Sequence, residues 1–180
     1  FERVQKAGAR FDPDKAKWFN EQQLRAQKDE ELGARFAVVL KERIGADHPS
    51  ASPAFATGAV KLLRERVQVE QVFYVTGKYL FEAPESYDEK VIAKRWNDKA
   101  KTFFLALPDQ LSGVAGYTAE ETKSAFEQLA ISQGLKPGDV LQLFRVIVSG
   151  QGSGIDLFGM VELLGKQEVN SRIQRALDRL

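Results

Sequence analysis

The residues best suited to carry chemistry in this chain surround one glycine cluster, "RVIVSGQGSGIDLF" at residues 145–158. An apolar run that begins with Arg145 ends in Ser149 and Gly150, and Gly152 and Gly154 follow it. A glycine-rich turn after an apolar segment can bind phosphate through its backbone N–H groups. The first question is therefore whether this stretch forms a nucleotide site.

The stretch lacks what a nucleotide site requires. A Walker loop places Lys and then Ser or Thr after its last glycine. Here Gly154 is followed by Ile155 and Asp156, and the carboxylate of Asp156 would repel phosphate. The dinucleotide fingerprint has a different glycine spacing and follows a strand of a βαβ unit. We interpret the cluster instead as a turn between two helices, in which glycine permits positive φ and leaves room for a flat group near Arg145.

Composition excludes several other chemistries. The chain has no cysteine, which removes disulfides, thiolate metal sites and a cysteine nucleophile. Its single histidine, His48, lies in a proline-flanked stretch typical of a surface loop, and one histidine does not supply a zinc site. Carboxylates are scattered without an acid–base or nucleophile pattern. The sequence therefore predicts no catalytic residue, no metal site and no cofactor within this chain.

Length and charge set the broad class. The 180 residues suffice for one core or two small subdomains. No apolar run approaches the length of a membrane span and no signal-peptide pattern is present, so we expect a cytoplasmic protein with no membrane partner. The net charge of +1 does not by itself indicate nucleic-acid binding, which would need a local basic patch. The charged start without Met suggests a piece of a longer protein.

Hydrophobic periodicity is helical almost throughout, which predicts an all-α fold. Asp12 is a candidate N-cap before Pro13, and Trp18 and Trp96 fall at apolar helical positions that indicate core packing. We expect a first helix after residue 13 and a second from about 29 to 44. A third begins near 52 and is broken around 66–69, and the segment after the break ends near 81. Further helices are expected at 87–107, 119–133 and 138–148, followed by two short ones separated by Gly165.

Two pieces of local chemistry support these boundaries. Ser86 with Glu89, and Thr118 with Glu121, have the spacing of a capping box. The β-branched residues around 67–74 favour a strand only weakly. Because "PDQLSGVAGY" interrupts the helical pattern after residue 107, we expect two consecutive helical subdomains, at 1–110 and 111–180.

The stretch "GLKPGDVLQLFRVIVSGQGSGIDLFGMVELLGKQEVNSRIQRAL" resembles the end of bacterial glutamyl-tRNA synthetases. The matching residues are Lys136, Gly138, Arg145, Ser149-Gly150, Leu157-Phe158, Leu163 to Lys166, Arg172 and Ala176-Leu177. The beginning, "FERVQKAGARFDPDKAKWFNEQQLR", resembles the segment after that family's catalytic domain, and "KYLFEAPESYD" resembles its Tyr-Leu-Phe stretch. Phe144, where the family usually has Pro-Leu, and Gln167 depart from the pattern.

The family's catalytic signatures, His-Ile-Gly-His and Lys-Met-Ser-Lys-Ser, are absent, and one His and one Met in total leave no place for them. The resemblance therefore implies an anticodon-binding helical region separated from the N-terminal catalytic domain of the same protein. It implies that the parent is a glutamate–tRNA ligase that uses ATP and magnesium to join glutamate to tRNA(Glu). This part alone is expected to be non-catalytic.

The resemblance also implies which residues read the anticodon. Unpaired bases are recognised by stacking and by hydrogen bonds to their edges, and arginine does both. Counting back from Tyr79 places the family's first reading arginine at Arg66, which in the family selects cytosine, for glutamate, over guanine, for glutamine, as the third anticodon base. The second reading arginine and a turn residue after it correspond to Arg145 and Gly154. Where the family often has Thr, Gly154 offers only its backbone.

Neighbouring basic residues are expected to contact phosphates, which position RNA without specifying its sequence. These expected backbone contacts are Lys61, Arg64, Lys166 and Arg172. Alternatives remain open: Arg66 as a solvated charge beside Glu65, and Arg145 paired with Asp139 or Asp156. The competing function is a helical protein-interaction domain without nucleic-acid binding, whose basic clusters are ordinary solvated faces.

Overall fold

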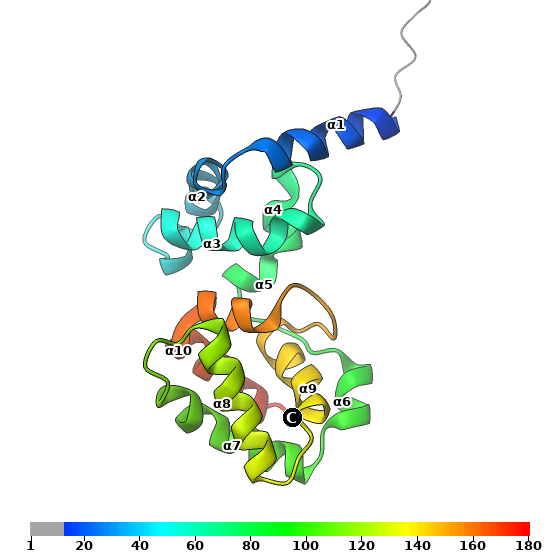
Figure 1. Ribbon diagram of the computed structural model, residues 1–180, viewed down its shortest axis with the longest axis vertical. Coiled ribbons are helices and arrows are strands. Elements are labelled where there is room, and N and C mark those ends of the chain that lie inside the picture. Colours follow the sequence, from blue (N-terminus) through cyan, green and yellow to red (C-terminus); the bar gives the residue numbers. More distant parts are fainter. Residues whose placement is uncertain (1–12) are drawn as a thin grey trace, which may run out of the picture.

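A computed structural model describes residues 13–180, and across that range it contains helices and turns but no strand (Figure 1). The all-α prediction is confirmed. Asp12 and the start of the stretch that carried the resemblance lie outside the described residues. The α-helices are α1 (Pro13–Ala26), α2 (Asp29–Ile44), α3 (Pro53–Leu63), α4 (Phe73–Thr76), α5 (Lys78–Phe81), α6 (Glu89–Arg95), α7 (Asp98–Ser112), α8 (Ala119–Ser132), α9 (Pro137–Ser149) and α10 (Leu157–Leu177), with 3₁₀ turns at Pro49–Ala51, Arg64–Arg66 and Glu70–Val72.

The helices form two lobes, α1–α5 and α6–α10 (Figure 1). In the first lobe α2 packs along α3, and in the second α7, α8, α9 and α10 pack together with α6 against α9. The expected division at residue 110 is therefore corrected, because that position lies inside α7 and α7 packs on α8 and α10. The packing changes at residues 82–88, between α5 and α6.

Aromatic side chains form the centre of each lobe. The second lobe buries Phe103, Phe104, Phe126, Phe144 and Phe158, whose neighbouring ring centroids lie 5.1 to 6.3 Å apart. Offset and edge-to-face contacts at such distances stabilise cores beyond simple area burial. Phe144, one of the two residues that depart from the family pattern, therefore belongs to this core and not to a site.

The predicted helix over 87–107 is two helices. Trp96 is extended, with φ −72° and ψ 125°, and Asn97 caps α7 by accepting from the N–H groups of Lys99 and Ala100. Helix α7 then continues through Pro108 to Ser112. A side chain that accepts first-turn N–H groups is the strongest local start signal for a helix, so Asn97 decides this boundary.

Caps and glycines set other helix boundaries. Thr118 and Glu121 form the predicted capping box, whereas α6 is capped by Asp88 and not by Ser86. Gly165 has φ 75° and ψ 166°, so it separates two helical segments within α10 as predicted. The predicted break around 66–69 is present, because Val67 and Val69 are extended, but α3 already ends at Leu63.

The core prediction for Trp18 is wrong. Helix α1 extends away from the rest of the first lobe (Figure 1), which leaves Trp18 62% exposed and Phe19 57% exposed. Trp96 is half-buried and stacks on Phe104 at 5.9 Å between ring centroids, which agrees with a packing role. Among the described helices, none is long and apolar enough to cross a membrane.

Candidate nucleic-acid interface

The glycine cluster is a loop between α9 and α10. Gly150 ends α9 in the left-handed conformation, with φ 78°, and donates its N–H to the carbonyl of Val146. Asp156 begins α10, where its carboxylate accepts from the N–H of Gly159 at 2.6 Å. The side chain of Asp156 is therefore a helix cap, a role that an acidic residue at a helix N-terminus commonly takes.

Two of the loop glycines serve packing within the chain. A Cβ at Gly150 would lie 2.7 Å from the carbonyl oxygen of Ser86, and one at Gly152 would lie 2.8 Å from a carboxylate oxygen of Asp88. The carbonyl of Gly150 also accepts the N–H of Asp88 at 3.0 Å. The expectation that Gly152 leaves room for another molecule is therefore wrong, because that space is filled by the segment before α6.

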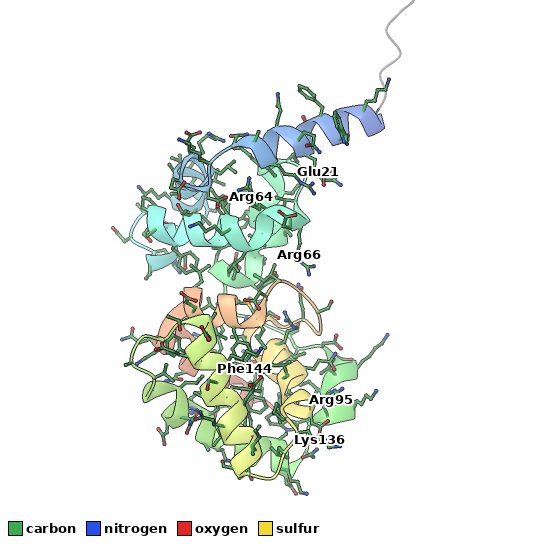
Figure 2. All side chains as sticks on the ribbon, viewed as in Figure 1. Glu21, Arg64, Arg66, Arg95, Lys136 and Phe144 are labelled. Carbon is green, nitrogen blue, oxygen red and sulfur yellow. The ribbon has the colours of Figure 1, made fainter. Side chains whose placement is uncertain are left out.

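Arg66 reaches this loop from the other lobe. Helix α3 gives way to the 3₁₀ turn Arg64–Arg66, and the guanidinium of Arg66 donates to the carbonyl of Gly154 at 2.5 Å (Figure 2). Two of the predicted site residues, far apart in the sequence, are thus in contact. Arg66 is exposed and makes no ion pair among the described residues, so its other N–H groups stay available.

Arg145 approaches the same loop from α9 and donates to the carbonyl of Ile155 at 2.6 Å. It forms no ion pair with Asp139 or Asp156 in the described part of the chain; Asp139 lies instead 3.8 Å from Arg95. Burial lowers the pKa of Arg145, whereas the charge of Asp156 raises it, and the guanidinium remains protonated at neutral pH. A Cβ on Gly154 would lie only 3.4 Å from this guanidinium.

Tyr79 completes the cluster and is a residue that the sequence interpretation used only as a landmark. Its hydroxyl lies 3.8 Å from a Cβ built at Gly154. Burial raises the pKa of Tyr79, and the charges of Arg66 and Arg145 and a backbone hydrogen bond at Ile155 oppose that rise. In the sequence only the spacing between Arg66 and Tyr79 draws attention to Tyr79, and that spacing does not show that the two residues lie near the same loop.

Arg64 has a structural role. Its side chain pairs with Asp29 and donates to the carbonyls of Leu24, Arg25 and Gln27, which joins the end of α3 to the α1–α2 turn. These contacts use the guanidinium that was expected to bind phosphate. Lys61, one turn earlier, is exposed and makes no ion pair among the described residues.

Arg172 is also corrected. It is 1% exposed, pairs with Glu168 at 2.8 Å, and donates to the carbonyls of Tyr79 and Val148, both at 2.6 Å. A side chain this deeply buried does not reach an RNA phosphate. Lys166 is partly exposed and donates to the carbonyl of Ser112 at 3.2 Å, so its charge also serves the second lobe.

The arrangement is suited to contact with a base. Two arginines and a tyrosine hydroxyl lie around the short backbone segment Gly154–Ile155, and planar guanidinium groups both donate to and stack on bases. Within residues 13–180 no group of three or more acidic or histidine side chains could hold a metal ion.

Comparisons with known proteins place the chain in a family. The model for anticodon binding domains matches residues 16–177. Glutamate–tRNA ligases of Cytophaga hutchinsonii and Flavobacterium johnsoniae are 34% and 35% identical over 98% and 99% of this chain. The chain spans about a third of these relatives' length, 34% in both cases.

Solved structures agree with this likeness. The crystal structure of a glutamate tRNA ligase from Elizabethkingia meningosepticum, in complex with its amino acid, matches all of this chain with a TM-score of 0.84 and 32% identity. The match covers 35% of that protein. From the helical fold and the family match over nearly the whole described chain, we conclude that this chain belongs to the anticodon-binding domain family.

Proposed function

We propose that this chain recognises the anticodon loop of tRNA(Glu) as one part of a glutamate–tRNA ligase. The observation that carries the proposal is the convergence of Arg66 and Arg145, from different lobes, on the Gly154–Ile155 backbone. Each guanidinium donates one N–H group to a loop carbonyl, and its other N–H groups are available to a base. The loop thus holds the two arginines in place before RNA arrives, which lowers the entropy lost on binding.

In this proposal Arg66 selects cytosine as the third anticodon base, and Arg145, with the backbone of Gly154, contacts another base of the same loop. The carbonyl of Gly154 already accepts from Arg66. A base that approached this point would therefore meet an arginine fixed by the protein's own backbone. Lys61 and Lys166 remain candidates for phosphate contacts, and Arg64 and Arg172 do not.

The joining of glutamate to tRNA belongs to the longer protein. We propose that its catalytic part uses ATP and magnesium and that the present chain contributes recognition and orientation of the tRNA. The names of the relatives, each a glutamate–tRNA ligase about three times as long, support this division of work.

Filter binding with a stem-loop RNA that carries the glutamate anticodon tests the proposal. We expect salt-sensitive binding by the wild-type chain, because phosphate contacts release counterions. Arg66→Ala and Arg145→Ala should each weaken it, whereas Lys41→Ala, which removes an exposed lysine of α2, should not. A folded wild-type chain that does not bind the stem-loop at low salt would contradict the proposal.

A further inference from the structure

Some of the described basic residues form ion pairs within the chain, and others do not. Arg25, Arg35, Arg64 and Arg172 each form an ion pair. Lys94, Lys99 and Lys136 are exposed and make no ion pair or side-chain hydrogen bond within residues 13–180. Free surface lysines are common singly, so their arrangement decides whether they matter.

These three lysines gather with Arg95 around one hollow. The hollow lies where α6 meets α7 and where α9 begins, and Lys94, Arg95, Lys99 and Lys136 all line it. Asp139 is the one carboxylate on its wall, 3.8 Å from Arg95 and with a side chain 63% exposed. Four cations thus face one anion, so the hollow carries an excess of positive charge although the whole chain is nearly neutral. We call these four residues the basic seam.

The basic seam is joined to the glycine loop by a chain of hydrogen bonds. Arg95 donates through Nε to the side-chain oxygen of Gln142 at 2.8 Å, and the amide of Gln142 donates to the carbonyl of Gly152 at 3.4 Å. In Figure 2 Arg66, Arg95 and Lys136 lie in the same half of the view. The hydrogen bonds through Gln142 therefore connect the seam to the loop that Arg66 and Arg145 contact.

Polar side chains of α9 link the two ends of the helix. Lys136, Asp139, Gln142 and Arg145 recur every three residues, so consecutive members are neighbours about one turn apart on a stripe that winds around the helix. At 1.5 Å per residue, Lys136 and Arg145 are separated by about 14 Å along the axis. A few nucleotides of a single-stranded loop can cover that span, with bases at Arg145 and phosphates toward Lys136.

From this arrangement we infer that the basic seam binds the phosphate backbone of the RNA whose bases the glycine loop contacts. The inference rests on the proposed anticodon recognition and adds to it a second, sequence-independent contact region on α6, α7 and α9. Lysines suit this role because their compact charge contacts phosphate without demanding a fixed geometry. Such contacts set the register of the RNA and carry no base preference.

Fluorescence anisotropy of the 180-residue chain with the same stem-loop RNA, across about 50 to about 500 mM salt, tests the inference. The test variant is Lys94→Gln/Lys136→Gln. The matched control is Lys41→Gln/Lys123→Gln, which removes two exposed lysines without ion pairs from α2 and α8 and changes the net charge equally. Circular dichroism and thermal unfolding should show that both variants remain folded, because all four side chains are exposed.

For a single strand the slope of log affinity against log salt falls by about 0.7 for each lost phosphate contact. The slope of the test variant should therefore be smaller by about 1.4. The ratio of the wild-type affinity to the variant affinity should then grow about 25-fold for each tenfold drop in salt. The control should keep the wild-type slope. The ratio of affinities for stem-loops with cytosine or guanine as the third anticodon base should be unchanged in the test variant.

The outcomes separate the two proposals. If the wild-type chain binds the stem-loop but the test variant keeps the slope of the control, the basic seam does not bind phosphate and anticodon recognition still stands. If the test variant changes the base preference, the seam lysines act at the base-reading loop and the inference is overturned. If the wild-type chain binds no stem-loop, both proposals fail.

Discussion

Arg172 and Arg145 both donate to backbone carbonyls near the junction of the two lobes, but in different surroundings. Arg172 is 1% exposed and satisfies the carbonyls of Tyr79 and Val148 together with Glu168. Arg145 is partly exposed and contacts one carbonyl, that of Ile155. The first arrangement joins α5, α9 and α10, whereas the second leaves donors free for a ligand. Burial and the number of contacts, and not the residue type, distinguish the structural Arg172 from Arg145, which we propose to bind RNA.

The largest expected effect is at Arg172. Arg172→Met should lower the free energy of unfolding by about 3 kcal/mol, because it leaves two buried carbonyls and Glu168 without their donor. Urea unfolding monitored by circular dichroism measures this. Arg175→Met, one turn further along α10 and exposed, should change stability by no more than about 0.5 kcal/mol. Equal stability of the two variants would show that Arg172 is not a structural joint.

Arg64 comes next. Arg64→Gln removes the ion pair with Asp29 and the contacts with three carbonyls, and should lower the free energy of unfolding by about 2 kcal/mol. Lys61→Gln, three residues earlier in α3, is the control and should leave stability unchanged. If Arg64→Gln weakened RNA binding strongly while stability stayed the same, Arg64 would contact RNA and would not be a structural residue.

Tyr117 shows what burial does to a polar group without partners. Its hydroxyl is buried with no hydrogen-bond partner in the described structure, and burial raises the pKa of Tyr117 to about 12. The unfolded chain loses this proton near pH 10 and the folded chain near pH 12, so stability should fall as pH rises between them, by up to about 1.4 kcal/mol per unit.

Tyr117→Phe should remove that part of the alkaline loss and gain about 1 kcal/mol at neutral pH, because no buried hydroxyl is left unsatisfied. Urea unfolding at several pH values between neutral and alkaline checks both. If the stability of Tyr117→Phe fell as steeply with pH above pH 10 as that of the wild type, the assignment would be contradicted. Tyr87→Phe serves as a comparison, because burial raises the pKa of Tyr87 while nearby arginine charges lower it.

The smallest effect on stability is expected at Arg66. Arg66→Ala removes an exposed side chain with a single backbone contact, so the free energy of unfolding should change by no more than about 0.5 kcal/mol. Thermal unfolding measures this. A large loss of stability would mean that Arg66 belongs with Arg172 as a joint between the lobes.

Much of the fold could be predicted from the sequence because helix signals are local. Hydrophobic periodicity, the Thr118–Glu121 capping box and Gly165 depend on neighbours a few residues away. The lobe boundary could not be predicted from such signals, because it depends on which helices α7 packs against. The exposure of Trp18 likewise follows from the way α1 extends beyond the first lobe, which no local pattern contains.

The site residues could likewise be predicted from the sequence only in part. Residue types and a family resemblance selected Arg66, Arg145 and Gly154, and the structure brings all three to one loop. Arg64 and Arg172 have the same residue type, but whether each contacts solvent or backbone depends on tertiary packing. The basic seam was missed because its lysines come from separate segments and lie together only in the fold.

The most direct test of anticodon recognition compares two stem-loop RNAs that differ only in the third anticodon base, cytosine or guanine, in binding to the wild-type chain and to Arg66→Ala. We predict that the wild-type chain prefers cytosine by about 1–3 kcal/mol, the range for one good bidentate contact, and that Arg66→Ala loses this preference while remaining folded. Equal affinity of the wild-type chain for both RNAs would contradict the assignment of Arg66 as a base reader.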